Sequence, residues 1–118
     1  MLSKIQKTRL TNAVNRGITK LTKHEGSLRW AEQIDLDRLE MFSRESCVIG
    51  QLNDGVYDPS KVLGEDIQDA RFGFVIPGRL YDGNDSEAYD YLTMVWTHKV
   101  RQIQNALKNL AKRYAGVR

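Results

Sequence analysis

The chain has 118 residues, of which 41% are hydrophobic and 28% charged, a composition that is typical of a globular domain and excludes a disordered chain. No apolar run approaches a length of about 20 residues, which a membrane-spanning helix needs, and the N-terminus lacks the pattern of a secretory signal. The single cysteine, Cys47, cannot form an intramolecular disulfide, which favours a cytoplasmic setting. We therefore expect one domain over residues 1–118, with no membrane partner.

The net charge of +3 conceals a separation of charge along the chain. Residues 1–23 and residues 99–118 each contain six basic residues and no acidic residue, so the two ends together contribute +12. All 15 acidic residues lie between Glu25 and Asp90, where six basic residues leave a net charge of −9. Such a separation indicates electrostatic contacts, either between parts of this protein or with a partner.

The first segment has the spacing of an amphipathic helix from Ser3 to His24, and Gly26 suits its C-terminal end. Its apolar stripe consists of Leu10, Val14, Ile18 and Leu21. At about 100° per residue, a basic face falls on nearly the opposite side. That face consists of Arg9, Arg16, Lys20 and Lys23.

The middle of the chain predicts several short helices separated by turn residues. We expect a short amphipathic turn or helix at residues 27–34. We expect short helical pieces after Asp35 or Asp37 up to Phe42, from Ser43 to Leu52, from Asp58 to Gly64, and at residues 65–72. Residues 72–86 lack helical character. Phe74 to Ile76 can extend, but Pro77 ends the extension and no second strand is available to pair with it. We expect an ordered loop held by aromatic residues.

The last segment predicts a long helix that is capped by Asp85 or Ser86. Its apolar residues follow spacings of three and four for roughly six turns, which is typical of a packed seam. The seam consists of Leu92, Trp96, Val100, Ile103, Leu107, Leu110 and Tyr114, and Arg101, Lys108 and Lys112 project from the far side. The predicted fold is all-α, with the long terminal helices packed together around the short middle helices and the loop.

No pattern in the sequence predicts a catalytic, metal or cofactor site. The two histidines, His24 and His98, have no second ligand at a metal-binding spacing, and Cys47 lies in an apolar run. Residues from Asp82 onward resemble a calcium-binding loop, but Glu87 stands where the loop needs glycine. We expect no enzymatic activity.

Binding is the better-supported hypothesis, and three interpretations of the charged surfaces stay open. The basic faces are either ordinary solvated helix faces or a nucleic-acid footprint made by both terminal helices. The footprint would consist of Arg9, Arg16, Lys20, Lys23, Arg101, Lys108 and Lys112. Alternatively, the acidic middle docks on a basic site of a protein partner and uses the aromatic residues Trp30, Tyr57 and Tyr81.

Three stretches of the chain resemble a family of small proteins encoded by actinobacterial phages and related mobile elements. They are NAVNRGITKLTKHEGSLRWAEQIDLDRLEMFSRESCVIGQL, LGEDIQDARFGF and YDYLTMVWTHKVRQIQ, and together they span most of residues 12–104. The family has no assigned activity, so the resemblance implies a bacterial host and a small accessory protein. We expect it to bind a host or phage protein. A nucleic-acid-binding module is the alternative, and a structural component of the virion is the third hypothesis.

Overall fold

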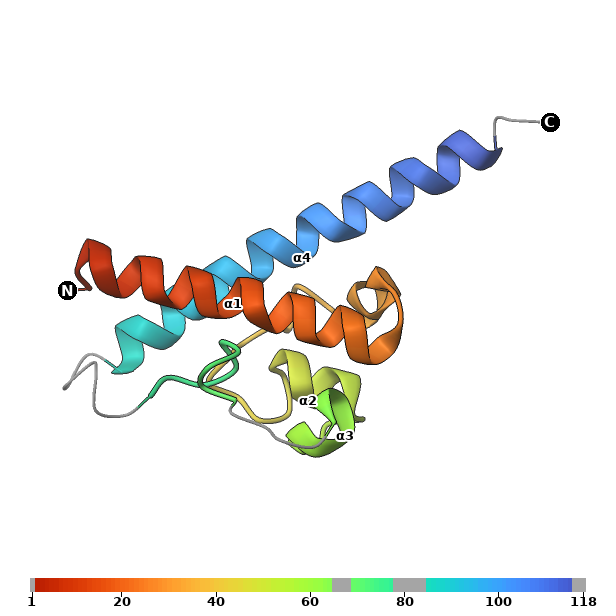
Figure 1. Ribbon diagram of the computed structural model, residues 1–118. Helices are drawn as coiled ribbons and strands as arrows, with labels where there is room; N and C mark the ends of the chain where they lie inside the picture. Colours follow the sequence, from red (N-terminus) through yellow and green to blue (C-terminus); the bar gives the residue numbers. More distant parts are fainter. Residues whose placement is uncertain (1, 65–68, 78–84, 116–118) are drawn as a thin grey trace.

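The computed structural model describes residues 2–64, 69–77 and 85–115 (Figure 1). Two long helices, α1 (Lys4–Glu25) and α4 (Asp85–Ala115), dominate the fold. Between them lie the 3₁₀ helix η1 (Leu28–Gln33) and two short helices, α2 (Val48–Leu52) and α3 (Pro59–Leu63). The described residues contain no strand, and the predicted all-α fold with packed terminal helices is confirmed.

Helix α1 begins and ends where the sequence predicts. The side chain of Ser3 accepts a hydrogen bond from the backbone of Gln6, and the Gln6 side chain accepts one from the backbone of Ser3, which together form a capping box. At the other end, Gly26 adopts the left-handed conformation and its N–H donates to the carbonyl of Thr22. The predicted apolar stripe lies inside, since Leu10, Val14 and Leu21 are buried and Ile18 is partly buried; it is confirmed.

Helices α1 and α4 cross near their N-terminal halves (Figure 1). Close to the chain's beginning, the backbone N–H of Leu2 donates to Glu87 of α4 at 3.1 Å. One turn further along α4, the hydroxyl groups of Thr11 and Tyr91 lie 3.1 Å apart. These contacts fix the first turns of α4 against α1, so the two segments that lie farthest apart in the sequence form one side of the core.

Three aromatic rings form the centre of the single hydrophobic cluster. Trp30 of η1 meets Trp96 of α4 edge to face at 6.4 Å between ring centres, and Phe74 stacks on Trp96 at 5.0 Å. Both indole N–H groups are satisfied, because Trp30 donates to the Thr22 hydroxyl and Trp96 donates to the Gly73 carbonyl at 2.7 Å. The cluster therefore joins η1, α4 and the segment of residues 69–77.

The segment of residues 69–77 crosses α1 at a very close approach that two glycines make possible. A Cβ atom at Gly17 would overlap the carbonyl oxygen of Phe72, and one at Gly73 would lie 2.7 Å from the backbone nitrogen of Val14. Gly73 also has a φ of +77°, a conformation that side chains rarely adopt. Residues 72–77 thus form the aromatic-held loop that the sequence predicts, and residues 78–84 of that loop lie outside the described residues.

The start of α2 differs from the sequence prediction. The helix predicted from Ser43 begins only at Val48, because the sulfur of Cys47 caps it by accepting from the backbone N–H of Gly50. The helix predicted from Asp58 is confirmed as α3, with Asp58 as its cap and Pro59 in its first turn. Helix α4 begins at Asp85 itself, so Asp85 and Ser86 lie inside its first turn and not before it.

Two further predicted helices are wrong in the described part of the chain. Residues 36–38 form a turn, because the Asp35 carboxylate accepts from the backbone N–H of Asp37 and Gln51 holds the backbone of Asp35 on both sides. Phe42, which the sequence places at the end of this predicted piece, is 74% exposed and packs edge to face on Tyr89. In the helix predicted at 65–72, residues 69–72 form a turn, and residues 65–68 lie outside the described residues.

Candidate binding surfaces

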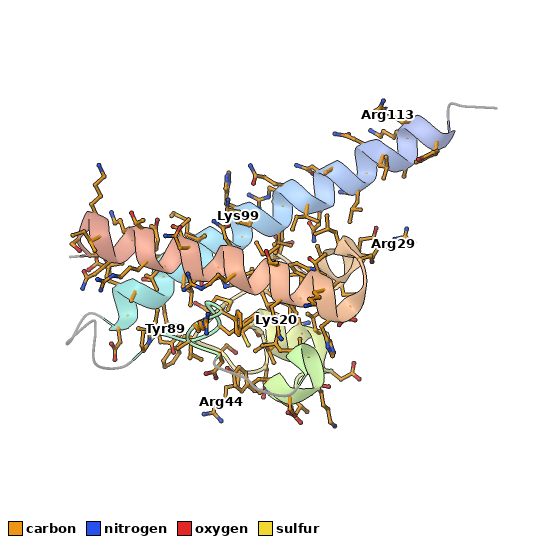
Figure 2. The ribbon with its side chains drawn as sticks, viewed as in Figure 1. Lys20, Arg29, Arg44, Tyr89, Lys99 and Arg113 are labelled. Atoms are coloured by element: carbon orange, nitrogen blue, oxygen red, sulfur yellow. The ribbon has the colours of Figure 1, made fainter. Side chains whose placement is uncertain are left out.

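The seven predicted basic residues fall into two separate groups. Arg9, Arg16 and Lys23 of α1 are exposed and Lys20 is half-buried, while the α4 residues Arg101, Lys108 and Lys112 are all exposed. At about 100° per residue, the α1 cations are centred roughly 150° around the helix from Thr11, which contacts α4. In Figure 2, Lys20 lies on the side of the 69–77 segment, whereas Arg113 lies far along α4. The two groups therefore do not form one surface.

The α1 cations adjoin a fifth cation that the sequence analysis missed. The Nε atom of Arg16 donates to the carbonyl of Arg71 at 3.0 Å, and the Lys20 ammonium lies 5.9 Å from the centre of the Phe72 ring. Arg71 itself is exposed. We call this set of five residues the α1 strip; it consists of Arg9, Arg16, Lys20, Lys23 and Arg71.

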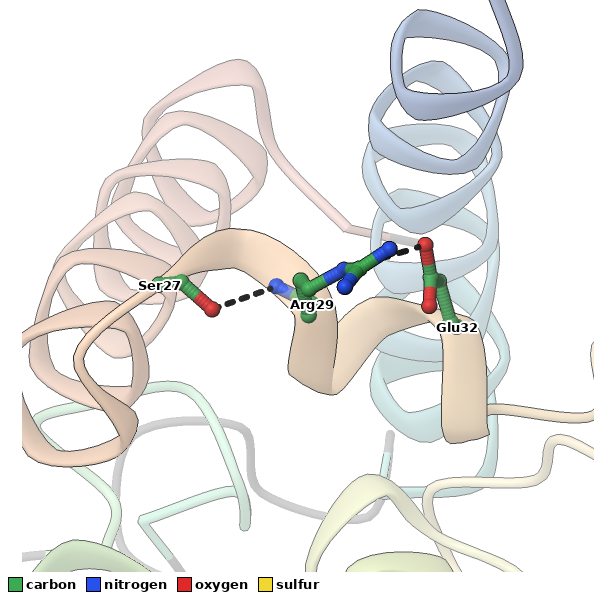
Figure 3. A network of polar contacts seen from close by, with 3 residues as sticks. All are labelled: Ser27, Arg29 and Glu32. Atoms are coloured by element: carbon green, nitrogen blue, oxygen red, sulfur yellow. Dashed lines mark hydrogen bonds and ion pairs between the residues drawn. The ribbon is translucent and has the colours of Figure 1, made fainter. Parts of the chain in front are cut away.

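Two shallow hollows that share Arg16 run along the α1 strip. One is lined by Asn15, Arg16, Thr19, Lys20, Lys23 and Phe72, and the other by Arg9, Leu10, Asn12, Ala13, Arg16, Ala70, Arg71 and Pro77. Neither lining includes a carboxylate. Among the described residues, the one ion pair is that of Arg29 with Glu32 on η1 (Figure 3). The five cations of the strip therefore form no ion pair with a described carboxylate.

The second surface is the part of α4 that extends beyond the other helices, here called the α4 end and comprising residues 103–114 (Figure 1). Among the described residues, the last polar attachment of α4 to the rest of the chain is Gln104, whose amide donates to the carbonyls of Ala31 and Ile34, both at 2.9 Å. Beyond this point about 15 Å of helix remains, at 1.5 Å per residue. Its extension contributes to the longest dimension of the molecule, 57 Å.

The predicted seam is buried only in its first half. Leu92, Trp96 and Val100 are fully buried, but Leu110 is 48% exposed and Tyr114 is 72% exposed. The expectation that the whole seam holds the fold together is therefore wrong for its last turns, because α1 and η1 end before α4 does. Ile103 and Leu107 are half-buried and border hollows on either side of α4, one of which reaches Leu28 and the other Glu32.

The α4 end has separate apolar and basic faces. Ile103, Leu107, Leu110 and Tyr114 fall within roughly 60° of each other around the helix axis. Arg101, Lys108 and Lys112 fall within roughly 40°, centred about 150° from the apolar residues. The apolar face of the α4 end thus continues the buried face of α4, while its cations point the opposite way.

The predicted acidic and aromatic surface is not assembled as expected. Trp30 is only 2% exposed, because its ring packs on Trp96 in the core, so the expectation that it contacts a partner is wrong. Tyr57 is half-buried and its hydroxyl donates to the Asp69 carboxylate at 2.8 Å. Burial and this hydrogen bond raise the pKa of Tyr57. Tyr81 lies outside the described residues.

The side chain of Cys47 is buried and has a structural role. Its thiol is 1% exposed, and burial raises its pKa. The nearest hollow is lined by Met41, Phe42, Arg44, Cys47, Tyr57, Asp69, Val75 and Tyr89, and neither histidine is among these residues. His98 is exposed on α4, and His24 lies close to Gly64. The buried small side chain predicted for Cys47 is confirmed, and the thiol also serves as the cap of α2.

Within the described ranges, histidine, cysteine and acidic side chains form no group of three that would hold a metal ion. None of the helices there combines the length and the apolar character that crossing a membrane requires. The chain matches no protein-family model, no curated protein and no solved structure.

Proposed function

We propose that this protein is a non-catalytic accessory protein that acts by binding a partner protein, and that the partner covers the apolar face of the α4 end. One observation carries the proposal: the apolar face that is buried up to Val100 continues onto Leu110 and Tyr114, which are 48% and 72% exposed. A helix face with apolar residues at spacings of four, three and four is the pattern by which helices pack on one another. A contiguous exposed apolar patch is typical of an interaction site.

The charge of the α4 end indicates the kind of partner it accepts. After Asp90 the chain contains no acidic residue, so the apolar face is set on a helix that carries only positive charge. Two copies of such a helix would repel each other, whereas an acidic amphipathic helix would bury the apolar face and pair with Arg113 at its border. The resemblance to phage proteins suggests that a host or phage protein supplies this helix.

Affinity capture with a matched pair of variants tests the proposal. The double variant Leu110→Asp/Tyr114→Asp places two charges on the apolar face, and Asn105→Asp/Asn109→Asp makes the same change of charge on exposed positions away from it. Captures from nuclease-treated host lysate, quantified by mass spectrometry, should enrich the same protein with the wild type and the asparagine variant. We expect an enrichment at least about tenfold lower with the apolar-face variant, which is the loss of about 1.4 kcal/mol of binding free energy.

Two results would contradict this proposal. One is an equal capture of every protein by both double variants, which would mean that the apolar face takes no part in binding. The other is a stable homodimer in light scattering that Leu110→Asp/Tyr114→Asp converts to a monomer, which would make a second copy of the chain the occupant. Because the four substituted residues are exposed, thermal melts of both variants should match that of the wild type.

A further inference from the structure

We infer that the α1 strip is a second, independent binding site, and that its ligand is the phosphodiester backbone of a nucleic-acid strand, bound without reading the base sequence. The strip brings together four cations of α1 and a fifth, Arg71, from a segment 48 residues or more further along the chain. The sequence alone suggests cations on both terminal helices as one footprint. The structure separates the two groups, and the hollows along the α1 strip include no residue of α4.

The spacing of the cations suits an extended polyanion. Arg9, Arg16, Lys20 and Lys23 are separated by seven, four and three residues, which corresponds to rises of about 10, 6 and 4.5 Å along the helix. The row is therefore about 21 Å long, which spans several consecutive phosphates of one strand. The exposed amides of Asn12 and Asn15 lie between the cations in the same hollows and are suited to donate to phosphate oxygens.

The site is held in place before any ligand binds. The carbonyl of Phe72 lies against Gly17, and the carbonyl of Gly73 accepts from the Trp96 indole, so the backbone that carries Arg71 is anchored to the core. Arg16 uses only its Nε–H on the Arg71 carbonyl, which leaves four N–H donors of its guanidinium for a phosphate. Such prior ordering reduces the entropy that binding must overcome.

The chemistry of the lining favours a nucleic acid over an acidic peptide. Every fully exposed residue of the two hollows is cationic, an amide or a hydroxyl, and Leu10 and Ala13 are buried. The remaining apolar residues of the linings, Ala70, Phe72 and Pro77, are only partly exposed, and the Lys20 ammonium lies 5.9 Å from the centre of the Phe72 ring. A peptide ligand generally needs a pocket for an apolar anchor, whereas a phosphate backbone binds through charge and counterion release alone. The 69–77 segment covers one flank of α1, so α1 is not free to enter a groove and read bases.

A fluorescence-anisotropy titration tests the site with two variants of equal charge. Arg9→Gln/Lys23→Gln/Arg71→Gln removes three strip cations whose side chains form no hydrogen bond or ion pair with another described residue. Arg101→Gln/Lys108→Gln/Lys112→Gln removes three cations from α4. The probe is a labelled single strand of mixed sequence, with its duplex as a second probe. With about 0.7 counterions released per phosphate, five cations predict a slope of log K against log salt near −3.5 for the single strand.

We expect the strip variant to bind at least about tenfold more weakly at low salt, with the slope reduced to roughly −1.4, and the α4 variant to bind like the wild type. The assignment of the α1 strip as a binding site would be overturned if binding did not depend on salt, or if the two triple variants weakened binding equally. Displacement of the strand by poly-glutamate at the same charge concentration would overturn the assignment to phosphodiesters. Circular-dichroism melts verify that the variants fold. If the triple variant unfolds, the single variants Arg9→Gln and Lys23→Gln take its place, and each should make the slope of log K against log salt about 0.7 less steep.

Discussion

Replacing Gly17 with alanine is expected to destabilise the protein, although alanine is the better helix former. In an exposed helix position this change stabilises by about 1 kcal/mol. At Gly17, however, the added Cβ atom would overlap the Phe72 carbonyl oxygen and lie 3.1 Å from Cζ2 of Trp96. The carbonyl belongs to the backbone and the indole to the centre of the core, so neither can move away freely.

The expected cost has two parts. Overpacking of this kind typically costs about 1–3 kcal/mol. Displacing the 69–77 segment also stretches the buried 2.7 Å hydrogen bond from the Trp96 indole to Gly73, and an unsatisfied buried donor costs about 1–3 kcal/mol more. After the gain in helix propensity is deducted, we expect a net loss of about 1–5 kcal/mol, which lowers the melting temperature by about 4 °C for each kcal/mol.

Urea unfolding followed by tryptophan fluorescence measures this loss, because both tryptophans lie in the core and Trp96 lies next to the substituted position. The matched control is Asn15→Ala on the exposed side of α1, which should leave the free energy of unfolding within about 0.5 kcal/mol of the wild type. A Gly17→Ala protein as stable as the wild type would refute the close packing of the 69–77 segment on α1. Anchoring of Arg71 in the α1 strip would then lose its support as well.

Three further outcomes follow from named contacts. Tyr57→Phe removes the donor to Asp69 and should lower the free energy of unfolding by about 1–2 kcal/mol in urea titrations; an unchanged value would mean that water replaces the bond without loss. Cys47, which is 1% exposed, should react with a thiol reagent at mildly alkaline pH only as fast as the protein unfolds, and rapid labelling of the native protein would contradict its burial. Leu92→Ala should cost about 2–5 kcal/mol whereas Leu110→Gln should change stability by less than about 0.5 kcal/mol; comparable losses in thermal melts would show that the α4 end is covered within the monomer.

The sequence by itself determined the features that depend on neighbours along the chain. The periodicity of Leu10 to Leu21 predicts the buried face of α1, and Ser3 and Gly26 predict its ends, because helix capping is satisfied within one turn. The same holds for Asp58 and Pro59 at the start of α3. Where a local interaction competes with the helix, as the Asp35 side chain does in its turn, the periodicity of the apolar residues was misleading.

Only the tertiary structure decided which of these faces is covered. Leu92 and Leu110 occupy equivalent positions of one seam, yet one is fully buried and the other 48% exposed, because α1 and η1 reach only the first half of α4. In the same way, Trp30 is buried by contact with Trp96, and Arg71 joins the α1 cations only because two glycines let its segment approach α1. Periodicity defines the side of a helix on which apolar residues lie, but burial and the grouping of charges depend on segments that the chain brings together from a distance.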